Sequence, residues 1–163
     1  MLVMLACSVY DTVMIIWFFG FVLLSVLAAL AVIDFKTMIL PNMLTFPLIF
    51  IGLLFAYWQN ALLAGVIGTA VGYAGLVALE LAYKRLRGID GIGRGDAKLL
   101  AAGGAWCGWY GLSFILLIAS FSGLIHALIL SKSGADPKNQ KLPFGPHLAL
   151  GIFLTWLALF VLR

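Results

Sequence analysis

Two long stretches without a charged side chain limit the possible folds of this 163-residue chain more than any other feature. One covers residues 13–33 and the other covers residues 99–130. About 20 apolar residues are enough for a helix to cross the hydrocarbon core of a bilayer. Only 10% of the residues are charged, whereas soluble domains average roughly 25%. The chain is therefore predicted to be an all-α, polytopic membrane protein that forms a single transmembrane domain over residues 1–163.

We expect about six transmembrane helices. The stretch 99–130 is too long for one span, and a turn is predicted near Gly108 and Gly111, because the intervening Trp109 and Tyr110 suit a membrane interface. The predicted spans are residues 13–33, 43–58, 61–83, the two halves of 99–130, and 146–162. Glycines four residues apart are expected to let the third and fourth spans approach their neighbours closely; they are Gly68 with Gly72 and Gly104 with Gly108.

The basic residues are distributed unevenly about these spans. If the N-terminus lies outside the cell, nine of the ten Lys and Arg residues fall in cytoplasmic loops, and only Arg163 falls outside. Because Lys and Arg prefer cytoplasmic loops, this orientation is predicted. The net charge of +4 is then a topology signal, and no nucleic-acid partner is expected. The same orientation places Asp34 and Asp96 at the same, cytoplasmic, side.

These two aspartates are the main candidates for a functional site. Asp34 ends the first apolar stretch, and the connector after it closes with Pro41, which suits a helix start. Asp96 lies in Gly93-Arg94-Gly95-Asp96, where glycine allows another chain to approach closely. Ionisable groups at the edge of apolar spans are costly to keep and usually serve a function. An ion pair with Lys36 or Lys98 is the alternative for either aspartate alone.

Two carboxyl groups held close together share a proton, because both cannot easily ionise side by side. The ionised carboxyl can take a proton from water, and the protonated one can donate to a carbonyl oxygen. This is the chemistry of aspartic proteases, and it requires neither a metal nor a nucleophilic side chain.

The other polar residues carry weaker signals. Glu80 is expected to pair with Lys84, four residues further along a helix. His126 is the only histidine in its apolar span and is expected to bond a neighbour, and neither it nor His147 has a metal-ligand partner at useful spacing. We therefore predict no metal and no cofactor. A solvated loop is expected for Arg85, Arg87, Asp90 and Arg94.

Taken together, these segments resemble the type IV prepilin peptidase family, which are membrane aspartic proteases of the GxGD type. Three segments carry the resemblance in the same order: IDFKTMILPNMLT at residues 33–45, GIGRGDAKLLAAGGAWCGW at residues 91–109, and LPFGPHLALG at residues 142–151. GxGD alone is a weak signal, but the three segments on a six-span frame are a strong one.

The resemblance implies that Asp34 and Asp96 are the catalytic pair. It implies cleavage of a basic leader from prepilins or pseudopilins, after a Gly, at the cytoplasmic face of a bacterial inner membrane, in a type IV pilus or type II secretion system. The expected partners are these substrates and the lipid bilayer. Motif support or substrate binding is expected of Pro41, Asn42, Gly93, Gly95 and Lys98.

Long members of the family carry an amino-terminal region with paired CxxC motifs, which is associated with methylating the new amino terminus. The sequence contains only two cysteines, Cys7 and Cys107, and no CxxC. A short form without methyltransferase activity is therefore expected. Two other functions stay open: a cation- or proton-coupled transporter in which Asp34, Glu80 and Asp96 relay cations, and a non-catalytic assembly subunit of a secretion or pilus machine.

Overall fold

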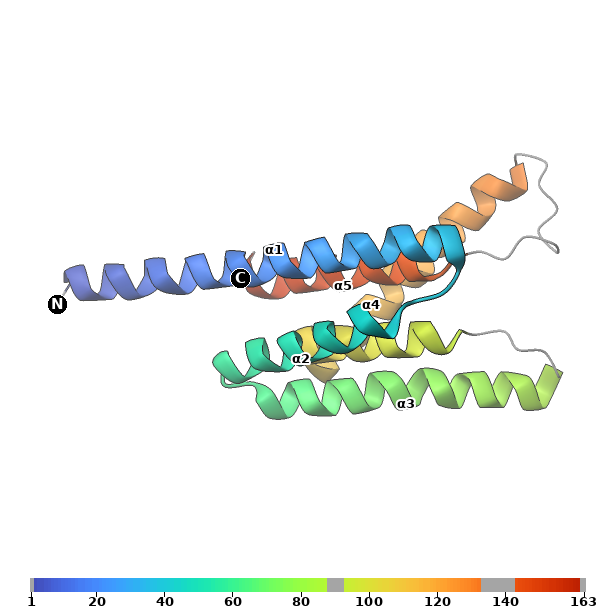
Figure 1. The fold of residues 1–163 in the computed structure, drawn as a ribbon, viewed down its shortest axis with the longest axis horizontal. Coiled ribbons are helices and arrows are strands. Elements are labelled where there is room, and N and C mark those ends of the chain that lie inside the picture. Colours follow the sequence, from blue (N-terminus) through green and yellow to red (C-terminus); the bar gives the residue numbers. More distant parts are fainter. Residues whose placement is uncertain (1, 88–92, 133–142, 162–163) are drawn as a thin grey trace.

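The computed structural model of the chain describes residues 2–87, 93–132 and 143–161, with side chains described over residues 12–86, 93–132 and 143–161. All regular structure in these ranges is helical (Figure 1). Five helices are present: α1 (Leu2–Thr37), α2 (Asn42–Trp58), α3 (Leu62–Arg87), α4 (Arg94–Lys132) and α5 (Gly145–Phe160). By length and composition, α1, α3 and α4 can cross a membrane, and α2 and α5 are shorter apolar helices. The chain is thus an all-α polytopic membrane protein, as predicted, while the number of spans stays a prediction.

The first helix is longer than the sequence predicted. α1 begins at Leu2 rather than near residue 13, because no proline or glycine interrupts residues 2–12. Its 36 residues correspond to about 54 Å at the usual rise per residue, well beyond a hydrocarbon core of about 30 Å. The N-terminal part of α1 accordingly projects past the other helices (Figure 1).

The connector between α1 and α2 is short, as predicted. Met38 has a left-handed φ of 53°, and its N–H donates to the Asp34 carbonyl at 2.8 Å, which closes the last turn of α1. Pro41 then occupies the position just before α2. The end of α1 and the start of α2 therefore lie close together.

The predicted break inside the long apolar stretch is present at Gly108. Its φ of 71° and ψ of 175° are not helical, and this region is essentially restricted to glycine. α4 consequently consists of residues 94–107 and residues 109–132, which run in different directions (Figure 1, yellow and orange).

The first half of α4 is the centre of the bundle. Every residue from Leu99 to Gly108 is buried, as expected of a helix that is apolar on all sides. α2 packs on one side, where the Trp106 Nε1–H donates to the Leu48 carbonyl at 2.9 Å. α5 also packs on α4, whereas α1 packs mainly on α5.

The two predicted glycine pairs join α3 to α4, the most extensive helix contact in the described residues. A Cβ atom at Gly68 would lie 2.5 Å from the Gly104 carbonyl oxygen, and one at Gly72 would lie 2.9 Å from the Leu100 carbonyl oxygen. Only glycine permits this direct backbone contact, so the predicted close approach is confirmed.

The charged loop predicted between the third and fourth spans is shorter than expected. α3 continues to Arg87, because Lys84, Arg85 and Leu86 are good helix formers and the first glycine of the segment is residue 88. Arg85, Arg87 and Arg94 are therefore helical rather than in a loop, while Asp90 lies outside the described residues. Most of the polar loop predicted at residues 131–141 also lies outside them.

Candidate active site

Asp34 ends a buried stripe along α1. The buried positions of this helix recur every three or four residues, so they form one face; they are Gly20, Leu23, Leu27, Leu30 and Asp34. Only 5% of the Asp34 surface is exposed. A carboxyl group thus occupies the last position of a face that is otherwise apolar.

The partner of Asp34 is the start of α5. The first N–H groups of a helix have no partner within the helix, and Phe144, which precedes α5, provides no side-chain cap. The Gly145 N–H instead donates to Asp34 Oδ2 at 3.0 Å. A Cβ at residue 145 would lie 2.5 Å from the same oxygen, so this contact requires glycine. The carboxylate of α1 therefore caps α5, at the end where the helix dipole favours negative charge.

Asp96 lies in the first turn of α4, at a second helix start. Its N–H donates to the Gly93 carbonyl at 3.0 Å, and its side chain is half-buried. A Cβ at Gly95 would lie 3.0 Å from Leu40, in the connector between α1 and α2. The Gly-Arg-Gly-Asp segment thus packs against the chain that follows Asp34.

The two aspartates line one pocket of about 210 Å³, close enough for the charge of Asp34 to act on Asp96. Its lining residues belong to the end of α1, the connector after it and the start of α4. Figure 1 shows these helix ends at the same end of the bundle as the starts of α2 and α5. The lining of the pocket contains five residues singled out in the sequence, namely Asp34, Gly93, Gly95, Asp96 and Lys98, together with Met38, Ile39, Leu40 and Arg94. The structure brings the candidate residues together, and their chemical roles stay a prediction.

Pro41 and Asn42, the other two candidates, lie beside this pocket. Lys98 Nζ donates to Asn42 Oδ1 at 2.6 Å and lies 5.8 Å from the centroid of the Phe46 ring. The buried Thr45 hydroxyl donates to the Pro41 carbonyl at 2.8 Å. Lys98 therefore joins the start of α4 to the start of α2.

Glu80 contacts a residue on another helix. Its Oε1 lies 3.6 Å from Arg94 Nε, and the Glu80 side chain is only 11% exposed. This contact links α3 to the first residue of α4, and the sequence did not predict it because the two residues lie on different helices.

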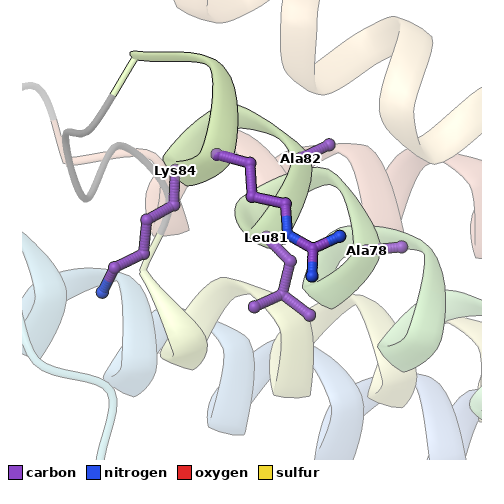
Figure 2. A pocket seen from close by; sticks show the side chains of 5 residues that line it. Ala78, Leu81, Ala82 and Lys84 are labelled. Atoms are coloured by element: carbon purple, nitrogen blue, oxygen red, sulfur yellow. The ribbon is translucent and has the colours of Figure 1, made fainter.

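A second and larger pocket, of about 570 Å³, lies near the C-terminal end of α3 (Figure 2). Its lining residues are Ala78, Leu81, Ala82, Lys84 and Arg85, with no carboxyl group among them. Lys and Arg beyond an apolar span are the ordinary pattern at a cytoplasmic membrane surface. The chemistry therefore points to the smaller pocket.

The prediction that His126 bonds a neighbour is confirmed. His126 Nδ1 lies 3.0 Å from His147 Nε2, and His147 Nδ1 lies 3.1 Å from Ser122 Oγ. The sequence did not reveal this cluster, because it depends on how α4 packs against α5. No group of three or more His, Cys, Asp or Glu side chains able to hold a metal occurs in the described part of the chain.

Gly145 was also not singled out as a site residue, although its N–H binds Asp34. The available signal was its place in the third of the resembling segments, between Phe144 and Pro146. A backbone donor carries no side-chain chemistry, so only its position in space reveals the role.

The fold and the site together define the class of protein: a helical membrane protein in which two aspartates line one pocket. Residues 21–128 match the type IV leader peptidase family, and the chain belongs to this family, as its sequence predicted. It is 44% identical over 134 residues to a "Prepilin leader peptidase/N-methyltransferase" of Burkholderia pseudomallei (strain 1026b), covering 81% of this chain and 43% of that protein. Proteins with the same name match in Pectobacterium carotovorum subsp. carotovorum (43% over 132 residues; 80% and 47% covered) and Escherichia coli (strain K12) (41% over 136 residues; 79% and 60% covered).

The chain thus spans about half the length of these relatives. Their names include an N-methyltransferase activity, and the expectation that this chain lacks it stays a prediction. No solved structure matches the chain.

Proposed function

We propose that this protein is an aspartic endopeptidase that removes the leader peptide of prepilins or pseudopilins, with Asp34 and Asp96 as its catalytic pair. The observation that carries the proposal is the shared pocket, which aspartates from two helices line. The names of its relatives supply the substrate class. The concentration of Lys and Arg on the same side in the predicted topology supports cleavage at the cytoplasmic face of a bacterial inner membrane.

The pair would work as an acid and a base. Two neighbouring carboxyls disfavour double ionisation, so together they carry one proton. The ionised carboxyl takes a proton from water as the water oxygen bonds to the scissile carbonyl carbon, and the protonated carboxyl donates to the carbonyl oxygen. The bond to nitrogen then breaks as a proton passes to that nitrogen. The leader leaves with a new carboxyl terminus, and the pilin keeps a new amino terminus.

The walls of the pocket suit an extended peptide from a membrane-held substrate. Gly93 is exposed and has no side chain, so a substrate backbone can approach the segment that precedes Asp96. Met38 and Ile39, which also line the pocket, are 50% and 68% exposed. An apolar rim of this kind fits a substrate whose own apolar segment lies in the bilayer.

The test is cleavage of a synthetic prepilin-like peptide, with a basic leader ending in Gly, by the purified protein in liposomes. Asp34→Asn and Asp96→Asn should each lower turnover by about a thousandfold or more, and the double variant should be no worse, because the two residues act as a unit. Asp11→Asn, near the other end of α1, is the matched control and should cleave normally.

Normal turnover by either single variant would contradict the assignment. The same assay separates the alternatives, because a transporter or an assembly subunit makes no shorter product. Addition of a chelator should leave the rate unchanged, and a loss restored by one metal would contradict the two-carboxyl mechanism.

A further inference from the structure

Three polar side chains outside the pocket form a continuous hydrogen-bond chain between α4 and α5. Ser122 and His126 lie on the second half of α4, and His147 lies in the first turn of α5. His147 Nδ1 is 3.1 Å from Ser122 Oγ, and His147 Nε2 is 3.0 Å from His126 Nδ1. None of the three is among the residues that line the pocket of Asp34 and Asp96.

The positions of the protons follow from the partners. The Ser122 hydroxyl donates to the Ala119 carbonyl at 3.1 Å, so its oxygen is left to accept. With the Ser122 hydroxyl donating to Ala119, a neutral His147 is assigned its proton on Nδ1, which donates to Ser122 Oγ, and its Nε2 accepts from the Nδ1–H of His126. Both ring nitrogens of His147 are used, so its ring is held at two points by α4.

This ring lies two residues after Gly145, whose N–H donates to Asp34. The start of α5 has no side-chain cap of its own. It is therefore held by the carboxyl of Asp34 on α1 and by Ser122 and His126 on α4. A shift of α5 relative to α4 would move the Gly145 N–H away from Asp34.

We infer that Ser122, His126 and His147 are positioning residues that fix the start of α5 and so keep the Gly145 N–H on Asp34. The inference rests on the proposed peptidase function, in which Asp34 is catalytic. It assigns the three residues to the orientation of the catalytic pair rather than to contact with the substrate.

A spectroscopic test follows the Gly145 N–H directly. Only Gly20 and Gly145 follow a phenylalanine in the sequence, so carbonyl-labelled Phe combined with nitrogen-labelled Gly leaves two amide signals, and Gly20 serves as an internal control. A hydrogen bond to a carboxylate moves an amide proton downfield. Ser122→Ala should therefore move the Gly145 signal upfield and leave Gly20 in place. Ser120→Ala, an exposed serine one residue away from Ala119, should move neither.

A kinetic test uses the same variants in the peptide assay. His147→Phe keeps the ring volume but loses both hydrogen bonds, and it should lower kcat about tenfold, as misplaced catalytic groups do, with KM within twofold. His147→Asn, which can still donate toward Ser122, should recover most of the loss. His126→Phe should cost less than His147→Phe, because the contact with Ser122 remains.

The inference is overturned if the Gly145 signal stays in place in Ser122→Ala, if the loss in His147→Phe falls on KM alone, or if His147→Asn is no better than His147→Phe. Thermal unfolding of each variant shows whether the fold is kept, and Ser122→Ala carries the test if His147→Phe does not fold. If the unaltered protein fails to cleave, the proposed function fails, whereas the signal of Gly145 still reports on the network.

Discussion

At the scale of single residues, the site pairs a carboxyl group whose burial costs free energy with the backbone N–H that donates a hydrogen bond to it. Asp34 continues a face that leucines fill elsewhere in α1, and it is almost completely buried. A buried polar group left without a partner costs about 1–3 kcal/mol, and the Gly145 N–H provides a partner. Gly145 is therefore as much a part of the site as the carboxyl it contacts.

Gly145→Ala tests this pairing. The added Cβ would lie 2.5 Å from Asp34 Oδ2, so the variant should lose about 1–3 kcal/mol of unfolding free energy, as overpacked sites do, and most of its peptide cleavage. The control is Gly123→Ala, where the nearest atoms lie at 3.9 Å and little should change. Equal activity of the two variants in the peptide assay would show that the contact with Asp34 is not needed.

The pH dependence of cleavage tests the sharing of a proton. At low pH both carboxyls are protonated and nothing accepts the proton of water; at high pH both are ionised and nothing donates to the carbonyl oxygen. A plot of kcat/KM against pH should therefore be bell-shaped, and the two apparent pKa values that it gives belong to the pair of aspartates rather than to either residue. Unfolding measured over the same range separates this effect from loss of structure. A profile that is flat over several pH units would argue against the mechanism.

At the scale of helices, glycines determine how α4 is shaped and packed. Gly68 and Gly104 bring the backbones of α3 and α4 into contact, and Gly108 breaks α4 so that its second half turns back. This turn brings the end of α4 beside the start of α5, where His126 meets His147. The break therefore affects the site from a distance.

Gly108→Ala should destabilise the protein by about 1–3 kcal/mol, because its φ and ψ lie in a region that residues with a side chain avoid. The measurement is thermal or denaturant unfolding in detergent. Gly75→Ala, on α3, is the matched control, since a Cβ there meets nothing within 4 Å and should leave stability unchanged or slightly higher. Equal stability of the two variants would mean that the break does not depend on glycine.

At the scale of the whole molecule, one end of the bundle collects the catalytic candidates and the ends of the helices that carry most of the basic residues (Figure 1). A relay of cations across the membrane needs groups near its midplane. Asp34 and Asp96 instead share a pocket at one end of their helices. This placement suits chemistry at a membrane surface.

Cysteine labelling tests the orientation. In a variant with Cys7 and Cys107 replaced by Ala, Leu86→Cys and Lys132→Cys should react with an impermeant maleimide from the cytoplasmic side only, because basic residues prefer that side. Leu86 is 85% exposed and Lys132 is also exposed. Gln59→Cys, at the other end of the bundle between α2 and α3, should react from the outside. Labelling of Leu86→Cys from outside would overturn the orientation and the cytoplasmic site.

The sequence by itself determined that the apolar segments are helical, where the long apolar stretch breaks, and which glycines let α3 meet α4, although it placed the start of α1 and the end of α3 inside their true bounds. These features depend on local causes, namely runs of apolar residues, the lack of an N–H in proline and the freedom of glycine. It also identified the family, since each of the three segments that carry the resemblance is an unbroken stretch of the chain.

Only the tertiary structure decided which groups complete the site. The bond from Gly145 to Asp34, the contact of Glu80 with Arg94 and the network of Ser122, His126 and His147 each join different helices. Such contacts depend on which helices pack together and at what register, and apolar faces of similar composition do not encode that choice locally. A backbone N–H, which every residue except proline possesses, acquires its role only from what lies opposite it in the folded chain.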